Sequence, residues 1–235
     1  MTGVLVVSGT GTSVGKTVVT AAIAALAIAR GDRVAVVKPA QTGTGAGDVP
    51  DTETVRRLTG LADTHELARF PDPLSPEAAA RAAALPPLDL RAAADYVAKL
   101  AESRDLVLVE GAGGLLVRYD PDGGTIAGLA AALAAPVAVV AAAGLGTLNH
   151  TALTLEALAA RKLAPAGVVI GSWPRQPGIA ELANLTDLQV LADGPLAGVM
   201  PEGAGELDPP GFLAAAMAGL AGSLGGSRAS SLNAL

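Results

Sequence analysis

The chain has 235 residues, enough for one large α/β domain with a substantial buried core. Its formal net charge of −6 argues against a general nucleic-acid-binding protein, and the absence of cysteine excludes disulfides, thiolate metal sites and a cysteine nucleophile. No apolar run reaches the roughly 20 uninterrupted residues of a membrane-spanning helix, so we expect a cytoplasmic protein with neither a membrane nor a nucleic-acid partner.

Short runs of apolar, largely β-branched residues alternate with longer alanine-rich segments, as in βα units on a parallel sheet. The predicted strands are residues 4–8, 34–38, 106–110, 137–142, 167–171 and 196–200. The predicted helices lie near residues 16–30, 52–61, 89–102, 147–162, 178–191 and 210–222. We expect one domain over residues 1–222, a mobile glycine-rich loop at 42–50 and a flexible tail at 223–235.

The clearest local motif follows the first predicted strand and opens the first helix. It reads Gly9-Thr10-Gly11-Thr12-Ser13-Val14-Gly15-Lys16-Thr17. Backbone N–H groups in such a loop surround the β-phosphate of a nucleotide, Lys16 bridges the β- and γ-phosphates, and Thr17 supplies a hydroxyl to Mg²⁺. A glycine-rich turn with an incidental lysine is the alternative interpretation. The motif predicts a three-layer P-loop NTPase-like α/β fold, with a mostly parallel sheet flanked by helices.

The spacing in this loop differs from the usual phosphate-binding signature. Five residues lie between Gly9 and Gly15, where the usual signature has four, and Thr10 occupies the normal glycine position. The loop is therefore a variant that is one residue longer.

Three charged side chains lie at strand ends or beside the mobile loop. Lys38 ends the second strand at the carboxyl edge, where open parallel sheets bind ligands, although a lysine extending into solvent is the alternative. Glu110 ends an all-apolar strand before a glycine-rich turn, the placement of a magnesium ligand. Asp51 is the second candidate carboxylate, with Asp48 and Glu53 close by as alternatives. Asp51 is an equally good N-cap for the helix near 52–61, and one residue could do both.

Four motifs in this order resemble those of the dethiobiotin synthetases. The phosphate loop is similar to that family's longer version, Gly-Thr-x-Thr-x-Val-Gly-Lys-Thr. The other matching elements are Lys38-Pro39 with Thr42-Gly43, Val109-Glu110-Gly111-Ala112-Gly113-Gly114, and Leu145-Gly146-Thr147-Leu148-Asn149-His150. The resemblance extends from about residue 3 to about residue 201 and leaves the carboxyl end unmatched.

This resemblance implies a Mg²⁺- and nucleoside-triphosphate-dependent ligase of biotin biosynthesis. Its substrates would be 7,8-diaminononanoate and CO₂, joined through a carbamate and a carbamic–phosphoric anhydride to give dethiobiotin, nucleoside diphosphate and phosphate. Lys16 and Lys38 would be catalytic, with Lys38 stabilising the carbamate. Thr17, Asp51 and Glu110 would share the metal ion.

The resemblance also implies where the nucleotide and the diamine bind. The implied nucleotide-binding residues are Thr12, Ser13, Val14, Gly15, Lys16, Thr17, Val18, Asp51, Glu110, Gly111, Ala112, Gly113, Gly171, Ser172, Met200, Pro201 and Glu202. The implied substrate-binding residues are Thr42, Gly146, Thr147, Leu148 and Asn149. The last four would bind the substrate carboxylate across the interface of a homodimer, although from sequence alone Thr147 and Asn149 are ordinary capping residues.

One position departs from the family pattern. Better-known members have an asparagine that recognises adenine, whereas this chain has Gly171 there. The paired donor and acceptor for adenine are then missing, so we expect ATP to be replaceable by another triphosphate such as CTP.

Three other functions fit the sequence less well. Partition or septum-site ATPases carry a second lysine in the phosphate loop, where this chain has Gly11, and they act on a partner or a membrane. Amidases of the cobyrinic acid type carry a glutaminase domain with a cysteine nucleophile, which is absent. A related carboxylase acting on a different diamine is the alternative that the sequence excludes least.

Overall fold

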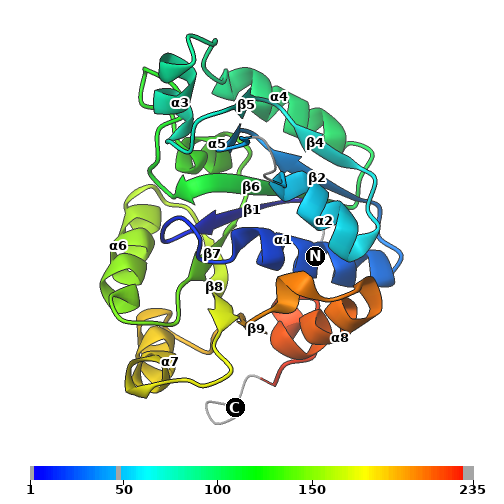
Figure 1. Ribbon diagram of the computed structural model, residues 1–235, viewed down its shortest axis with the longest axis vertical. Coiled ribbons are helices and arrows are strands. Elements are labelled where there is room, and N and C mark those ends of the chain that lie inside the picture. The colour runs from blue at the N-terminus through cyan, green and yellow to red at the C-terminus, as the bar shows by residue number, and fades with distance from the viewer. Residues whose placement is uncertain (1–2, 46–48, 230–235) are drawn as a thin grey trace.

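The computed structural model describes residues 3–45 and 49–229, which fold around a parallel sheet of seven strands in the order β4-β2-β6-β1-β7-β8-β9 (Figure 1). The strands are β1 (Gly3–Gly9), β2 (Val34–Lys38), β4 (Thr64–Glu66), β6 (Leu106–Gly114), β7 (Val137–Ala141), β8 (Pro165–Trp173) and β9 (Gly198–Pro201). A second sheet contains β3 (Gln41–Thr42) and β5 (Arg69–Phe70). Because β1 pairs with β6 and β7, the loop after it lies at the centre of the carboxyl edge.

The helices cover both faces of the large sheet, so the fold has three layers (Figure 1). They are α1 (Lys16–Ala29), α2 (Asp51–Thr59), α3 (Pro76–Ala82), α4 (Leu90–Ala101), α5 (Ile126–Ala132), α6 (Thr147–Ala160), α7 (Ile179–Leu191) and α8 (Pro209–Gly219), with short 3₁₀ helices η1 (Ala204–Glu206) and η2 (Gly222–Leu224). No helix within the described residues is both long enough and apolar enough to cross a membrane.

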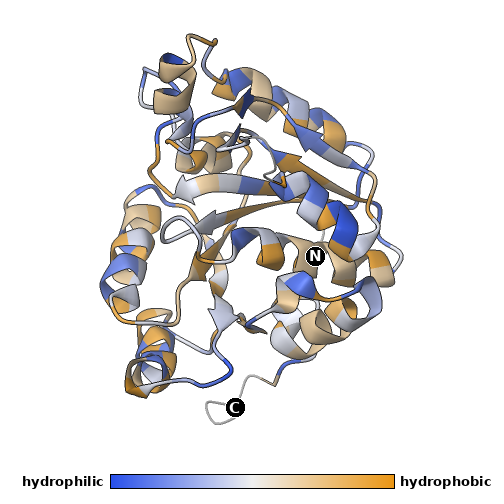
Figure 2. Ribbon diagram, in the orientation of Figure 1, coloured by the Kyte–Doolittle hydropathy of each residue, from blue (hydrophilic) through white to orange (hydrophobic). Residues whose placement is uncertain are grey.

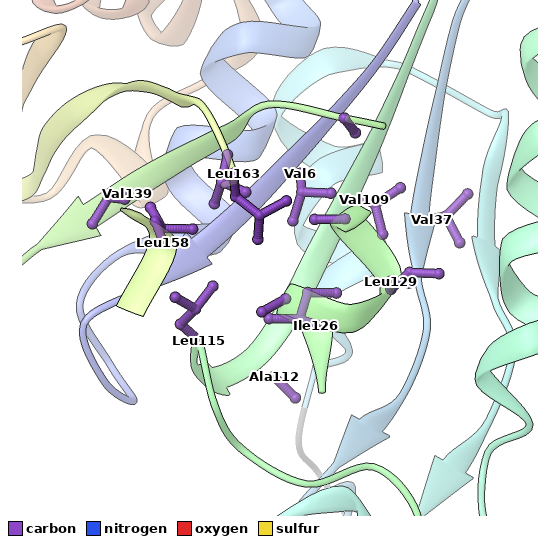
Figure 3. Close-up of a cluster of buried hydrophobic side chains, with 14 of the residues drawn as sticks. Val6, Val37, Val109, Ala112, Leu115, Ile126, Leu129, Val139, Leu158 and Leu163 are labelled. Carbon is purple, nitrogen blue, oxygen red and sulfur yellow. The ribbon is translucent and has the colours of Figure 1, made fainter. Parts of the chain in front are cut away.

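Each face of the sheet has its own hydrophobic core, because successive side chains of a strand point to opposite sides. Val6 and Val109 pack with α4, α5 and α6 in the cluster of Figure 3, whereas Leu5 and Leu108 pack against α1 and α8. Burial on both faces explains why the strands are almost uninterrupted apolar runs. In Figure 2 the hydrophobic colour follows the central strands, while α2 carries a strongly hydrophilic stretch.

All six predicted strands and all six predicted helices are present, with small differences at their ends. The predictions missed α3, α5, β3, β4 and β5, which are short elements of two to seven residues. Segments this short show too little periodicity to be recognised from sequence.

Two predicted flexible segments lie partly within the described residues. Thr42, in the glycine-rich loop 42–50, belongs to β3 and pairs with Phe70, and residues 46–48 lie outside the described residues. In the predicted tail 223–235, Leu224 belongs to η2 and is 1% exposed, and residues 230–235 lie outside the described residues. The prediction of a single domain over residues 1–222 stays a prediction.

Candidate active site

The phosphate loop connects β1 to α1 and has the conformation of an anion-binding turn. Gly15 has φ +95° and Ser13 has φ +58°, and such left-handed residues turn backbone N–H groups toward a common point. The ammonium of Lys16 donates to the carbonyl oxygen of Gly11 at 2.8 Å, so the lysine folds back over its own loop. Burial, reinforced by the positive charge of Lys38, lowers the pKa of Lys16 to about 8. The negative charge of a bound triphosphate would stabilise the protonated form of Lys16.

Lys38 lies at the carboxyl end of β2 and is 3% exposed, which rules out the alternative of a lysine extending into solvent. Its Nζ atom is 2.8 Å from Glu110 Oε1 and 2.5 Å from Asp51 Oδ2, and it donates to the carbonyl oxygen of Gly111 at 3.2 Å. One buried cation therefore lies between two carboxylates from different elements.

The three charges determine one another's protonation. Burial lowers the pKa of Lys38, but the charges of Glu110 and Asp51 outweigh burial and leave the pKa raised. For Asp51 burial raises the pKa most, but the charge of Lys38 and the hydrogen bonds of Lys38, Thr17 and Glu110 together leave it lowered. The pKa of Glu110 is raised, first by burial and further by the charge of Asp51, against the lowering effect of Lys38. Asp51 therefore releases its proton more readily than an ordinary aspartate, and Glu110 holds a proton more tightly than an ordinary glutamate.

The donor atoms around Thr17 fit a magnesium ion. Thr17 Oγ1 donates to Glu110 Oε1 at 2.9 Å, and the Thr17 hydroxyl also contributes to lowering the pKa of Asp51. Hard oxygen donors of this kind suit Mg²⁺, which takes one or two carboxylates and completes its shell with phosphate oxygens and water. The described residues contain no group of three or more His, Cys, Asp or Glu side chains arranged as a metal site.

Asp51 does not have the capping role that was the alternative for it. The N-cap of α2 is Pro50, and Asp51 is the first residue of the helix. Its carboxylate points to Lys38 instead of to the helix amides.

Two adjoining hollows open around these side chains. The first has a volume of about 400 Å³ and is lined by Thr12, Ser13, Gly15, Lys16, Thr17, Val18, Lys38, Gln41, Thr42, Asp51, Glu110, Ala112 and Gly113. The second, about 530 Å³, shares Thr12, Thr42, Ala112 and Gly113 with the first and adds Gly43, Pro73, Leu74, Ser75, Pro76 and Val117. A polar cavity beside the phosphate loop therefore continues into a hollow with apolar side chains.

The residues predicted to contact the base lie outside both hollows. Trp173 of β8 is paired with Pro201 of β9, and the amide of Glu202 donates to the Trp173 carbonyl oxygen at 2.8 Å. Met200 is fully buried, backbone included. The structure also supplies a reason for glycine at position 171. A Cβ there would overlap the carbonyl oxygen of Val14, because β8 ends directly against the phosphate loop.

The start of α6 is likewise separate from the two hollows of its own chain. Leu148 and Asn149 line a different, apolar groove between α6 and α7. The N-cap of α6 is Gly146, with φ +92° and no side-chain cap, so the interpretation of Thr147 and Asn149 as capping residues is wrong. Thr147 is 2% exposed, and its hydroxyl has no hydrogen-bond partner in the part of the chain that the structure describes.

Sequence reasoning missed several residues at the site. Gln41 lines the first hollow, and Pro73 and Leu74 line the second. Tyr119 is fully buried, and its hydroxyl accepts the amide of Ala112 at 2.6 Å, which anchors the glycine-rich turn. Only Gln41 could have been found from the sequence, because it lies within the matched motif that begins at Lys38. The other residues belong to segments without a recognisable sequence pattern.

Solved structures with similar folds are nucleotide-binding proteins. The septum site-determining protein MinD from Pyrococcus horikoshii, complexed with Mg-ADP, aligns with a TM-score of 0.55 and 18% identity over 92% of this chain and 86% of that one. A ParA family ATPase from Chlorobium tepidum aligns with a TM-score of 0.57 and 12% identity over 92% and 90% of the two chains. At these identities the likeness shows the P-loop NTPase fold alone.

Sequence comparisons identify the family. The family model described as AAA domain matches residues 3–204. The chain is 63% identical over 222 residues to the ATP-dependent dethiobiotin synthetase BioD of Frankia casuarinae, covering 94% of this chain and 93% of that protein. It is 56% identical over 223 residues to the protein of the same name from Streptomyces avermitilis, covering 95% and 94%. The chain therefore belongs to the family of ATP-dependent dethiobiotin synthetases, ligases of biotin biosynthesis.

Proposed function

We propose that the chain carries out the Mg²⁺- and nucleoside-triphosphate-dependent carboxylation and ring closure of 7,8-diaminononanoate with CO₂. The products are dethiobiotin, nucleoside diphosphate and phosphate. The observation that carries the proposal is the buried Lys38 ammonium, held between Asp51 and Glu110 in the same hollow as the phosphate loop and Thr42. A lysine in this position can neutralise a substrate anion that is attacking a phosphate.

The chemistry has three steps. One amine of the diamine attacks CO₂ and loses a proton, which gives a carbamate. A carbamate oxygen then attacks the γ-phosphorus, and the nucleoside diphosphate leaves. The second amine attacks the carbonyl carbon of the resulting carbamic–phosphoric anhydride and loses a proton, phosphate leaves, and the five-membered ring closes.

Positioning and charge neutralisation carry these steps, because none of them needs a covalent nucleophile from the protein. The loop amides and Lys16 bind the β- and γ-phosphates, and Lys38 offsets the negative charge of the carbamate during phosphoryl transfer. Thr42 holds the diamine or its carbamate. A magnesium ion held by Thr17, Asp51 and Glu110 would supply Lewis-acid neutralisation of the phosphate oxygens. The hollow that includes Pro73 and Leu74 supports binding of an alkyl chain.

The nucleotide base is recognised without a side chain at position 171. We expect backbone groups near Gly171, Ser172 and Pro201 to contact the base, so that ATP and CTP are both accepted. Steady-state constants for the two triphosphates test this, and a strong preference for ATP would contradict it.

A homodimer in the cytoplasm is the proposed form of the enzyme. Leu145, two residues before α6, is 95% exposed, and α7 carries Ile179 and Val190, which are 90% and 75% exposed. Apolar side chains in such positions favour burial against a second copy, which would bring Gly146–Asn149 to the substrate carboxylate in the neighbouring site. Sedimentation equilibrium gives the mass that decides this.

The deciding experiment measures phosphate release with ATP, Mg²⁺ and bicarbonate, with and without 7,8-diaminononanoate, while dethiobiotin is followed by mass. Release that depends on the diamine and equals the product formed supports the proposal. Lys38→Ala should then abolish dethiobiotin formation. Phosphate release indifferent to the diamine, without dethiobiotin, would reject it and leave a phosphate-loop NTPase of another kind.

A further inference from the structure

Asp51 is the most weakly held of the three proposed metal ligands. Glu110 and Thr17 are anchored by the long strand β6 and by α1. Asp51 is instead the first residue of a nine-residue helix, and its side chain is 30% exposed. The position of its carboxylate therefore depends on what holds the first turn of α2.

The side chain of Gln41 holds that turn. The first four N–H groups of a helix have no partner within the helix, and Pro50, the N-cap of α2, provides no side-chain cap. Gln41 Oε1 accepts the amide of Asp51 at 3.0 Å, which makes it a cap supplied from outside the helix. Its Nε2 atom donates to the carbonyl oxygen of Thr42 at 3.2 Å, which fixes the orientation of the amide group.

Gln41 is itself fixed by its surroundings. It is 8% exposed, and its backbone amide donates to the Ala68 carbonyl oxygen at 2.9 Å where β3 meets β5. Lys38 lies just before this segment, at the end of β2. The hydrogen bond from Asp51 to Gln41 thus joins the start of α2 to the segment that carries Lys38 and Thr42.

We propose that Gln41 is a positioning residue that sets the Asp51 carboxylate as a magnesium ligand, through the hydrogen bond between its side-chain oxygen and the Asp51 amide. This inference rests on the proposed function, which makes Asp51 a ligand. Gln41 does not touch the metal or the substrate in this role. Gln41 links the segment that carries Lys38 and Thr42 to Asp51, and so fixes the distance between the substrate-binding residues and the metal ligand.

The test compares Gln41→Met with Gln189→Met. Methionine has a similar length and volume but no amide group. Gln189 is a matched control, because it is also 8% exposed and, among the described residues, its amide donates a single hydrogen bond, to Leu185 within α7. A third variant, Gln41→Glu, keeps an acceptor oxygen for the Asp51 amide.

The first measurement is hydrogen exchange at the Asp51 amide, by NMR without ligands. Gln41→Met should speed exchange at this amide at least about tenfold, since a lost hydrogen bond of about 1.4 kcal/mol corresponds to tenfold. Gln189→Met should leave it close to wild type, and Gln41→Glu, which keeps the acceptor but loses the donor to Thr42, should exchange more slowly than Gln41→Met. Unchanged exchange in Gln41→Met would overturn the proposal.

The second measurement is equilibrium binding of a non-hydrolysable triphosphate while Mg²⁺ is titrated. Gln41→Met should raise the half-saturating Mg²⁺ concentration about tenfold and leave binding without Mg²⁺ within about twofold. Equal weakening with and without Mg²⁺ would mean a merely structural role and would overturn the proposal. If Gln41→Met does not fold, Gln41→Glu decides. This variant keeps an acceptor for the Asp51 amide, so Mg²⁺ should still strengthen triphosphate binding to it. Triphosphate binding that no longer responds to Mg²⁺ in this folded variant would also overturn the proposal.

Asp51→Asn separates this inference from the proposed function. If Asp51→Asn changes the Mg²⁺ dependence and Gln41→Met does not, only the role of Gln41 is wrong. If neither variant changes it, the assignment of Asp51 as a ligand is wrong and the inference falls with it.

Discussion

Replacing Lys38 with methionine should destabilise the protein in a way that depends on pH. The substitution keeps most of the side-chain volume and removes the cation between Asp51 and Glu110. Asp51 is partly exposed and can turn to water, but Glu110 is 1% exposed and would be left buried without the ammonium group that it contacts. Removing one partner of a buried pair costs about 3–5 kcal/mol of the free energy of unfolding. We expect a loss in that range at pH 8.

The sign of the pH dependence follows from Glu110. Without Lys38, burial and Asp51 raise its pKa, and only the weaker effect of the Thr17 hydrogen bond opposes them. A carboxyl whose pKa is raised on folding contributes stability below its unfolded pKa of about 4.3, and this stability is lost as the pH rises through the folded pKa, by up to about 1.4 kcal/mol per pH unit. The raised pKa of Lys38 in the wild type adds a constant amount between pH 5 and 8, because its unfolded pKa of about 10.4 lies above this window. The deficit of Lys38→Met should therefore grow from pH 5 to pH 8.

Urea unfolding of the free protein at several pH values measures this difference. The exposed Lys99 supplies the matched control, and Lys99→Met should stay within about 0.5 kcal/mol of wild type. The double variant Lys38→Met with Glu110→Gln removes both charges and should recover most of the loss. A deficit below about 1 kcal/mol at pH 8, or one that is the same at pH 5 and pH 8, would refute this account of the charges.

Three further predictions follow from contacts at the phosphate loop and at the glycine-rich turn of β6. Because the pKa of Lys16 is lowered to about 8, triphosphate binding at pH 8 should take up protons, seen by calorimetry in buffers of different ionisation enthalpy; no uptake at pH 8 would contradict this. Gly171→Asn should destabilise the protein by about 1–3 kcal/mol and weaken ATP and CTP binding together, since the side chain would force β8 away from Val14; a selective gain for ATP would show that the strand yields without cost. Tyr119→Phe should cost about 1–3 kcal/mol in urea unfolding by leaving the Ala112 amide without its acceptor, and a neutral result would mean that the amide finds another.

Much of the fold was predictable because its signals are local. The runs that form β1, β2 and β6 are buried on both faces and therefore apolar throughout, and the phosphate loop is contiguous in the sequence. By contrast, β3 and β5 have two residues each, and their pairing is set by the path of the chain between β2 and α3. No periodicity exists in two residues.

The site was predictable where a charged residue ends an apolar strand, because a charge in that position has few structural roles. Lys38 and Glu110 stood out for this reason, and the structure brings them to within 2.8 Å. Gln41 did not stand out, because its partner is a backbone amide ten positions away on the far side of a glycine-rich segment. Leu74 belongs to a loop whose composition is ordinary. The hydrogen bond of Gln41 and the position of Leu74 in the hollow both arise only when the chain folds, so neither leaves a pattern in the sequence.

The order of the strands matters for a chain that is still being synthesised. β1 lies between β6 and β7, so among the described residues it has no strand to pair with until Leu106 has left the ribosome. The phosphate loop can take its final conformation only later in synthesis, because the amide of Thr10 donates to the carbonyl oxygen of Val140 in β7. The apolar residues of β1 are therefore exposed while more than the first hundred residues are made, a period in which a nascent chain is open to aggregation and to chaperones. A truncated product ending before β7 would carry the whole nucleotide motif and still lack the scaffold that shapes it.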